Sequence, residues 1–354
     1  MKNTVDNEMA FLHKIAGSFP RHPKQLNKLF EADGEILDLH LQSPNFLVAK
    51  TDSIREEIQQ GLYEDPFLIG WMAVTVSASD LAATGADLMG ILLSLEIPQD
   101  YSEEWMKEFQ RGVIEACHSY QTYIIGGDTN FSKQISVTAS AIGTITNSRP
   151  LLRKPIRPGN LLYSTGALGA GSALAYARFF DADLQVAYQP FARLKESKIL
   201  REFATACIDT SDGLFPAISV LGEINQTGIN FFKPLQDILC TTTATIYQKT
   251  KIPAWAFLAG PHGEYELLFS IAPSNQHAFE NACADAMWHP LLLGKATENK
   301  KINFVSEEIN IHCEAAEIAN LFGEAGGNIQ HYYQLLMQKH QQWTTKTALY
   351  AYKK

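Results

Sequence analysis

Aspartates follow short apolar stretches at several places in this sequence, in a pattern that indicates metal-binding chemistry. Asp128 comes after the apolar residues 123–125 and the glycines Gly126 and Gly127. An apolar run of this kind is typical of a buried strand, and glycines after it allow positive φ and close approach of the backbone to a ligand. Several carboxylates at the ends of buried elements are what a magnesium–polyphosphate site requires. The other aspartates in such positions are Asp52 after strand 46–49, Asp80 in an apolar helix, and Asp209 and Asp212 around Ser211.

Each of these motifs also has a purely structural interpretation. Gly126-Gly-Asp-Thr129 fits a polar turn between two strands, and Asp80 fits a cap on a neighbouring element. Asp209 or Ser211 fits the N-cap of a helix that follows. Two aspartates around one serine exceed what a cap needs, and the pattern recurs along the chain. The recurrence favours a shared metal and phosphate site.

Composition limits the classes of protein that are compatible with the chain. With 354 residues, 46% hydrophobic and 19% charged, it is long enough for two domains. A net charge of −9 argues against nucleic-acid binding through the overall field, but not against a nucleotide held through magnesium. No apolar run approaches a membrane span, and the N-terminus lacks a signal-peptide core. Five scattered cysteines without a C-x-x-C pair indicate reduced thiols and a cytoplasmic protein.

The first half is expected to form an α/β layer, in which strands alternate with helices. A largely buried helix over 66–84 would carry Asp80, and residues 53–60 are expected to form a loop. The remaining expected elements are a helix over 8–30, strands over 46–49 and 88–95, a helix over 102–120, the strand that ends at Gly126, and its hairpin partner over 134–146.

A segment rich in proline and arginine, 149–159, is the predicted domain boundary. It divides the chain into 1–148, 149–310 and a polar helical extension, 311–354. In the second part the glycine loop 165–172 joins a strand to a helix and offers N–H groups to an anion. Its spacing is neither that of a Rossmann fold nor that of a P-loop, so tight packing is the commoner explanation. The expected elements here are strands 161–164, 229–232 and 291–295 and helices 173–180, 191–203, 214–224 and 275–287.

Seven blocks in order resemble the thiamine-monophosphate kinase family, and the match covers roughly residues 8–305. That family belongs to the superfamily of aminoimidazole ribonucleotide synthetase, selenophosphate synthetase and a hydrogenase maturation protein. Seven ordered blocks are more specific than any single motif. The blocks are Thr51-Asp52, Ser79-Asp80-Leu-Ala-Ala-Thr-Gly-Ala86, Gly126-Gly-Asp-Thr129, Arg153…Pro158-Gly159, Thr165-Gly166…Gly169, Asp209-Thr-Ser-Asp-Gly-Leu214 and Glu264-Tyr-Glu-Leu-Leu-Phe269.

The resemblance implies an α/β (α+β) protein with a two-domain aminoimidazole ribonucleotide synthetase-like fold. Its N-terminal sheet would form a shared barrel in a homodimer, and its C-terminal domain would be a mixed sheet with helices. ATP and Mg²⁺ would bind between the two halves. The implied reaction is phosphoryl transfer from ATP to thiamine monophosphate, which gives thiamine diphosphate. The implied partners are small molecules, without nucleic acid or membrane.

The resemblance also assigns roles by position. Phosphoryl transfer depends on positioning and charge neutralisation, and a phosphate acceptor is already ionised, so no strong general base is expected. The implied magnesium ligands are Asp33, Asp52, Asp80, Asp128, Asp209 and Asp212. The implied nucleotide-lining residues are Gly126, Gly127, Asp128 and Thr129, with Arg153, Asp209 and Ser211 at the phosphates.

The chain departs from the family pattern mainly where the acceptor would bind. The stretch Glu31–Glu35 keeps a single aspartate of the family's pair, and residues 55–60 differ from the usual continuation after Thr51-Asp52. Glu264 takes an aspartate's position, and residues 311–354 look unrelated to the family. Two alternatives therefore remain beside the kinase: the same nucleotide site with another acceptor, and a non-catalytic nucleotide-binding homologue.

Overall fold

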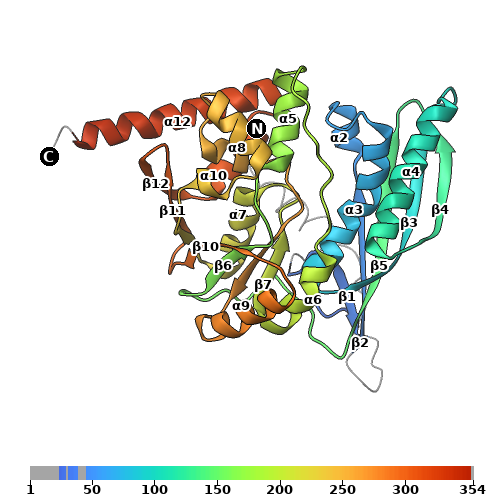
Figure 1. Cartoon of the computed structure of the whole chain (residues 1–354), viewed down its shortest axis with the longest axis horizontal. Helices are drawn as coiled ribbons and strands as arrows, with labels where there is room; N and C mark the ends of the chain where they lie inside the picture. The colour runs from blue at the N-terminus through green and yellow to red at the C-terminus, as the bar shows by residue number, and fades with distance from the viewer. Residues whose placement is uncertain (1–23, 29–30, 39–44, 352–354) are drawn as a thin grey trace. The chain divides into compact units, whose positions relative to one another are not determined.

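A computed structural model of the chain describes residues 24–28, 31–38 and 45–351, with side chains through residue 345. The described residues fall into two compact units, shown with their elements in Figure 1. The N-terminal unit comprises the described residues up to Arg153 together with 187–209. The C-terminal unit comprises 154–186 and the described residues from Thr210 on. The division after Arg153 falls inside the proline- and arginine-rich segment 149–159.

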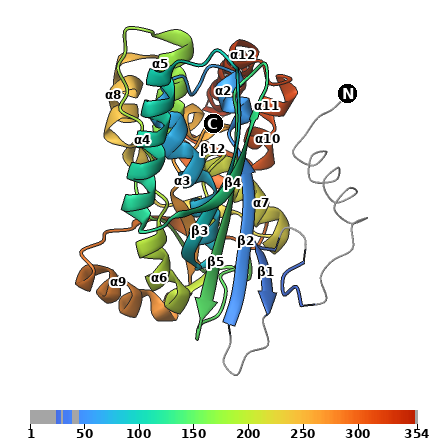
Figure 2. The ribbon, with the colours of Figure 1, turned by 90° about the vertical axis from the view of Figure 1, so that its right-hand side faces the viewer.

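The N-terminal unit is a five-stranded sheet with helices on one face. The strand order is β1-β2-β5-β3-β4, and all neighbours are antiparallel except β3 and β4, which are parallel. In Figure 2 the strands run in front of α3 and α4, and no described helix covers their outer face. The elements are β1 (Glu35–Asp38), β2 (Asn45–Ser53), α2 (Arg55–Gln59), α3 (Pro66–Thr84), β3 (Asp87–Ile97), α4 (Glu103–Tyr120), β4 (Ile124–Phe131), β5 (Ser136–Thr146), α6 (Leu194–Phe203) and β7 (Ala204–Asp209).

Helix α3 forms the core of this unit, as its composition predicts. Asp65 caps its N-terminus by accepting a hydrogen bond from the Phe67 N–H, Pro66 occupies the first turn, and Gly85 ends the helix with φ of 81°. Every residue from Leu68 to Thr84 is buried. The helix is long and apolar enough to span a membrane, contrary to the sequence expectation, but 94% of its apolar window is buried inside the structure. It is therefore a core helix, and Asp80 lies inside the protein.

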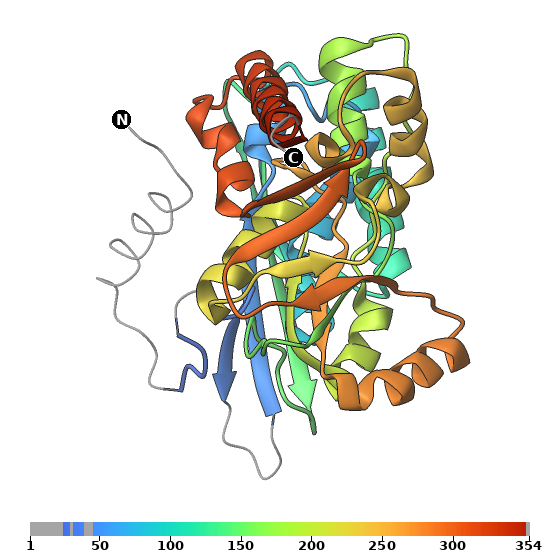
Figure 3. The same ribbon diagram turned by 90° about the vertical axis from the view of Figure 1, so that its left-hand side faces the viewer.

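The C-terminal unit contains a mixed sheet, in which β8 and β11 are parallel and the other neighbours antiparallel. Its strands follow the order β12-β11-β8-β10-β6-β9 (Figure 3). The strands are β6 (Leu161–Ser164), β8 (Ile229–Phe231), β9 (Leu267–Ile271), β10 (Leu291–Ala296), β11 (Lys301–Ser306) and β12 (Ile309–Glu314). The helices are α5 (Ala170–Phe180), α7 (Leu214–Asn225), α8 (Thr241–Lys249), α9 (Gln276–Asp285), α10 (Ala316–Ala319), α11 (Leu321–Glu324) and α12 (Ile329–Ala351), with short 3₁₀ helices at Leu235–Ile238, Ala254–Leu258 and Pro273–Asn275.

The C-terminal extension is attached to this unit by aromatic packing. Trp343 of α12 lies edge-on to Trp255, with ring centroids 5.0 Å apart, and also contacts Phe304 of β11. The Trp255 indole N–H donates to Nδ1 of His340, 3.3 Å away. Most of the predicted polar helical extension, 311–354, is α12, but its first residues belong to strand β12 instead of a helix.

Several predicted elements differ from the structure. Residues 124–131 form one continuous strand, so Gly126-Gly-Asp-Thr129 is not a turn, and β5 pairs with β2 and β3 rather than in a hairpin with β4. Local sequence could not reveal this, because pairing partners are chosen by tertiary packing. Residues 55–59 form a helix instead of a loop, and helix α6 starts at Leu194. Most of the helix predicted over 8–30 lies outside the described residues, while Gln25 forms a bridge with Leu37.

Candidate metal and nucleotide site

Three of the predicted aspartates meet inside the N-terminal unit. Asp33 precedes β1, Asp80 lies in the last turns of α3, and Asp209 ends β7. Carboxylate oxygens from the three lie within 4.8 Å of one another, and all three residues are buried. Among the residues that the structure describes, this is the one group of three acidic, histidine or cysteine side chains close enough to share a metal ion. We call it the acidic cluster.

Neighbouring side chains orient the acidic cluster. The Ser79 hydroxyl donates to Oδ2 of Asp209 at 2.7 Å, and the Arg153 guanidinium forms an ion pair with Oδ1 of Asp33. Lys50 of β2 lies 3.1 Å from Oδ1 of Asp80 and 3.4 Å from Oδ2 of Asp52, so it links Asp52 to the cluster. Arg153 is a site residue implied by the family resemblance, and the structure places it at Asp33, whereas Lys50 is not among the residues predicted from the sequence. The sequence feature that could have indicated Lys50 is its position directly before the motif Thr51-Asp52.

The chemistry of the acidic cluster fits a divalent cation. Burial raises the pKa of Asp80 well above its ordinary value, and the charges of Asp209, Asp52 and Asp33 raise it further, while Lys50 lowers it. The Asp33 side chain is 2% exposed, and its Oδ2 is buried without a hydrogen-bond partner. Buried, unpaired carboxylate oxygens are costly, and oxygen ligands of this kind are what Mg²⁺ binds. Asp33, Asp80 and Asp209 are therefore the residues that fit a magnesium ion.

Asp128 lies on the opposite face of the same sheet. Lys50 and Asp52 pair with the buried residues Ala141 and Ala139 of β5, which is the face that packs on α3. Asp128 pairs with Ser94 of β3, which in turn pairs with Thr138 of β5. Successive residues of a strand alternate between faces, so Thr138 and Ala139 point to opposite sides. Asp128 therefore points away from α3, and within one chain it does not join the acidic cluster.

The other nucleotide-lining candidates lie with Asp128 on strand β4, all of whose residues are exposed. The Asp128 carboxylate accepts a hydrogen bond from Asn130 at 2.6 Å. A Cβ added to Gly127 would lie 2.0 Å from the Leu93 carbonyl oxygen. The absence of a side chain at Gly127 is thus needed for β4 to pair with β3. Gly126 and Thr129 complete this exposed edge.

Ser211 and Asp212 belong to the C-terminal unit, in the turn that leads into α7. The Gly213 N–H donates to the Thr210 carbonyl at 2.9 Å, which closes the turn. Asp212 is exposed and Ser211 half-buried. Asp209 and Asp212, although three residues apart, are therefore assigned to different units.

Two glutamates of the same unit accept hydrogen bonds from the glycine loop before α5. Glu264 accepts hydrogen bonds from the Gly169 N–H at 2.7 Å and from the Thr210 hydroxyl at 3.1 Å. Glu266 accepts one from the Thr165 hydroxyl. The Gly169 N–H, a candidate for phosphate binding, is thus satisfied internally. From the sequence alone Glu264 is only a departure from the family pattern, because its hydrogen-bond partners Thr210 and Gly169 lie 54 and 95 residues away.

Replacement of Glu264 by Gln is expected to remove a pH-dependent loss of stability. Burial, followed by the charge of Glu266, raises the pKa of Glu264 to about 8. A raised carboxyl pKa contributes stability that is complete below the unfolded pKa, near 4.5, and is lost as pH rises through the folded value. Between pH 5 and pH 8 the wild type should therefore lose about 3 kcal/mol of unfolding free energy that Glu264→Gln does not lose.

Urea unfolding followed by circular dichroism at pH 5, 6.5 and 8 measures this difference. Glu202→Gln is the matched control, because Glu202 is exposed. A parallel pH dependence in the wild type and Glu264→Gln would contradict the assignment.

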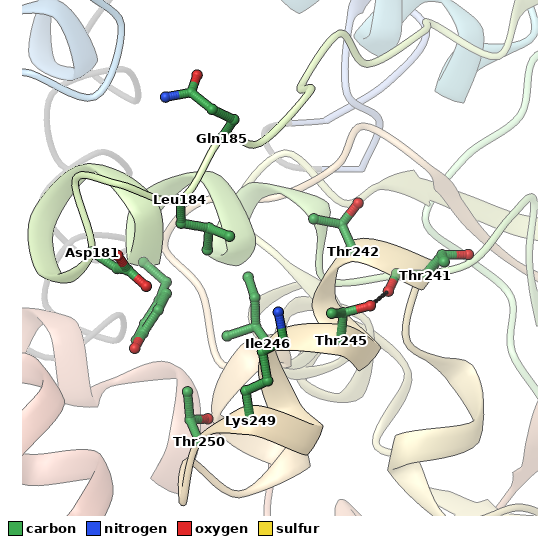
Figure 4. Close-up of a pocket in the computed structure, with 10 residues that line it drawn as sticks. Asp181, Leu184, Gln185, Thr241, Thr242, Thr245, Ile246, Lys249 and Thr250 are labelled. Atoms are coloured by element: carbon green, nitrogen blue, oxygen red, sulfur yellow. Dashed lines mark hydrogen bonds between the residues drawn. The ribbon is translucent and has the colours of Figure 1, made fainter.

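A separate pocket of about 370 Å³ opens in the C-terminal unit between the end of α5 and α8 (Figure 4). Leu184 and Ile246 supply apolar walls, and Thr241, Thr242 and Lys249 supply polar groups. The Thr245 hydroxyl is already bonded to the Thr241 carbonyl at 2.9 Å. None of the predicted site residues lines this pocket.

Comparison with known proteins first defines the structural class of this protein. The family profile described as "AIR synthase related protein, N-terminal domain" matches residues 32–145. A solved structure of tt0281 from Thermus thermophilus superposes with a TM-score of 0.70 at 22% identity, covering 84% of this chain and 95% of that one. Escherichia coli HypE, a hydrogenase maturation protein, superposes with a TM-score of 0.63 at 16% identity, covering 88% and 97%. The fold is therefore the AIR synthase-like α/β fold, as predicted.

Curated relatives narrow the class to one family. Thiamine-monophosphate kinases from two Buchnera aphidicola subspecies, those of Schizaphis graminum and Acyrthosiphon pisum, are 32% and 30% identical. The matches cover 76% and 74% of this chain and 84% and 83% of the relatives. The chain belongs to the thiamine-monophosphate kinase family. The structure described as "AaThiL complexed with AMPPCP and TMP" superposes with a TM-score of 0.68 at 19% identity, covering 84% of this chain and 92% of that one.

Proposed function

We propose that the protein transfers a phosphoryl group from ATP to thiamine monophosphate and so forms thiamine diphosphate, in the cytoplasm and with Mg²⁺ as cofactor. The observation that carries the proposal is the buried acidic cluster with the unpartnered Oδ2 of Asp33. The names of the curated relatives supply the acceptor, and one related structure is described with an ATP analogue and TMP. Neither nucleic acid nor a membrane has a part in this reaction.

The residues of the acidic cluster would hold the magnesium, with Asp52 joined to them through Lys50. When bound, the metal would neutralise phosphate charge and orient the transferred group. Ser79 fixes the rotamer of Asp209 through its hydrogen bond, and Arg153 fixes that of Asp33. Ser211 and Asp212 are proposed to approach the phosphates from the turn before α7. The acceptor oxygen of a phosphate monoester is already ionised, so no side chain has to remove a proton from it.

A homodimer is proposed because exposed apolar side chains gather at the β3–β4 end of the N-terminal sheet, and because Asp128 on the outer face of this sheet lies away from the acidic cluster. Among the described strands, β4 is at the edge of its sheet and pairs only with β3, and edges of this kind pair with other chains unless they are blocked. Asp128 and Gly126 are on this face, away from the acidic cluster. A second copy packed there, as in a shared barrel, would give Asp128 a role in a site. The exposed apolar residues of β3, of β4 and directly before β4 are Met89, Leu92, Tyr123, Ile124, Ile125 and Phe131, and Leu92 among them shares the face of Asp128.

Incubation of the purified chain with ATP, MgCl₂ and thiamine monophosphate tests the activity, with thiamine diphosphate measured by chromatography. We expect stoichiometric ADP and thiamine diphosphate, and no product once EDTA exceeds the metal. Absence of thiamine diphosphate at micromolar enzyme would reject the proposal.

The second candidate is the same reaction type with another acceptor, favoured by the changed segment at 55–60, which forms the separate helix α2. ATP consumption stimulated only by a different phosphorylated metabolite would support it. Nucleotide binding without turnover for any acceptor would instead identify a non-catalytic homologue.

A further inference from the structure

Lys50 places a side-chain ammonium against the acidic cluster. It projects from β2 on the face that packs against α3, with Nζ 3.1 Å from Asp80 and 3.4 Å from Asp52. Its side chain is 28% exposed, whereas that of Asp80 is 6% exposed. An ammonium on a flexible four-carbon stem can leave one carboxylate for another or for water without any change in the backbone. Lys50 is therefore a movable cation beside a fixed, buried anion.

The charged groups at the acidic cluster carry a net negative charge that one divalent ion would neutralise. Asp33, Asp80 and Asp209 form the cluster, and Asp52 is joined to it by Lys50. In the described part of the chain, Arg153 forms an ion pair with Asp33, and Lys50 forms ion pairs with Asp80 and Asp52. If these four carboxylates and two cations are all ionised, their own charges sum to −2, which is the charge that one Mg²⁺ neutralises.

Arg153 and Lys50 would affect metal binding differently. Arg153 holds Oδ1 of Asp33 and leaves the buried Oδ2 of that carboxylate without a partner, so it does not block the cluster. Lys50 lies on Oδ1 of Asp80, which is one of the carboxylates the metal would need. Two cations on one carboxylate repel each other strongly where water is excluded.

We propose that Lys50 is a tethered cation that competes with the divalent metal for Asp80 and thereby lowers the metal affinity of the acidic cluster. In the metal-free protein its ammonium compensates Asp80 and Asp52. When metal binds, the ammonium moves away from Asp80 toward Asp52 and solvent. The inference rests on the proposed function, because it takes the acidic cluster as the magnesium site of that reaction, but its test requires neither ATP nor an acceptor.

The test is titration of MnCl₂ alone into chelator-treated, full-length protein, followed by calorimetry and by electron paramagnetic resonance of free Mn²⁺. The wild type should bind one ion, and Lys50→Gln should bind it with a Kd at least about tenfold lower, because the competing charge is gone. Lys50→Arg keeps the charge and should stay within about threefold of the wild type. Lys107→Gln removes an exposed lysine of α4 and is the remote control.

Thermal unfolding gives an independent readout. Without metal, Lys50→Gln should melt below the wild type, because Asp80 loses its counter-ion, and Mn²⁺ should raise its Tm more than that of the wild type. Lys50→Met is the second neutral variant if the glutamine variant does not fold. An unchanged or higher Kd in a folded neutral variant would overturn the proposal, as would a wild type that binds no Mn²⁺. Neither result decides kinase activity, which the thiamine monophosphate assay measures separately.

Discussion

Asp80→Asn should lower kcat for thiamine diphosphate formation by about a hundredfold to a thousandfold. Asp80 is the member of the acidic cluster that also contacts Lys50, so its charge acts on both the metal and the cation beside it. Loss of one preorganised charged group at a reacting phosphate typically costs two to three orders of magnitude in rate. Asparagine keeps the shape and one oxygen of the aspartate but not its charge. The measurement is single-turnover formation of thiamine diphosphate at saturating ATP and MgCl₂.

The same substitution should leave the fold intact, and this separates chemistry from stability. Burial raises the pKa of Asp80, so its ionised form is costly in the folded protein, and a neutral amide avoids this cost. We expect the Tm of Asp80→Asn in EDTA to equal or exceed that of the wild type. Asp100→Asn, at an exposed turn, is the control for both measurements. Near-normal turnover by Asp80→Asn would refute the assignment of the acidic cluster as the catalytic metal site.

The second large effect is expected from Leu92→Glu on the outer face of the N-terminal sheet. Leu92 is 39% exposed and pairs with Ser140 of β5 and with Gly126 of β4, so it lies on the same face as Asp128. A buried, unpaired carboxylate at a dimer interface costs several kcal/mol, which is enough to dissociate a dimer of micromolar affinity. The variant should sediment as a monomer at concentrations where the wild type is a dimer. Its kinase activity should fall at least about a hundredfold.

Ile114→Glu is the matched control for the dimer prediction. Ile114 is an exposed aliphatic residue of α4, 52% exposed, on an element that is not part of the sheet. It should leave both the sedimentation coefficient and the activity unchanged. A monomeric wild type with full activity would disprove the proposed dimer. A dimeric and active Leu92→Glu would place the interface on another surface.

The candidate site was predictable from sequence where local pattern alone decides the structure. Residues 66–84 are apolar all round, which predicts a buried helix and thus a buried Asp80. Asp209 follows an apolar run, and the structure ends β7 at this residue. Asp33 is predicted as a site residue only by the family resemblance, because a turn with one aspartate has no distinctive pattern of its own.

Pairing of distant strands decided what the sequence left open. The face of a sheet on which a side chain lies depends on strand register, and one residue of register reverses it. Asp52 and Asp128 both lie in apolar–acidic motifs, yet β5 pairs Asp52 with Ala139, while Asp128 pairs with Ser94 on the other face. The sequence alone does not distinguish Lys50 from an ordinary surface lysine, because its partner Asp80 lies 30 residues away in the chain.

The sequence by itself thus determined which carboxylates the protein has, that Asp80 and Asp209 lie in buried elements, and the family to which the chain belongs, because these depend on residue type, local periodicity and the order of the motifs. Only the tertiary structure decided that Asp33, Asp80 and Asp209 share one buried cluster, that Lys50 occupies its edge, and that Asp128 faces outward. These contacts join residues far apart in the chain, and their geometry follows from strand register and helix packing, which no short stretch of sequence encodes.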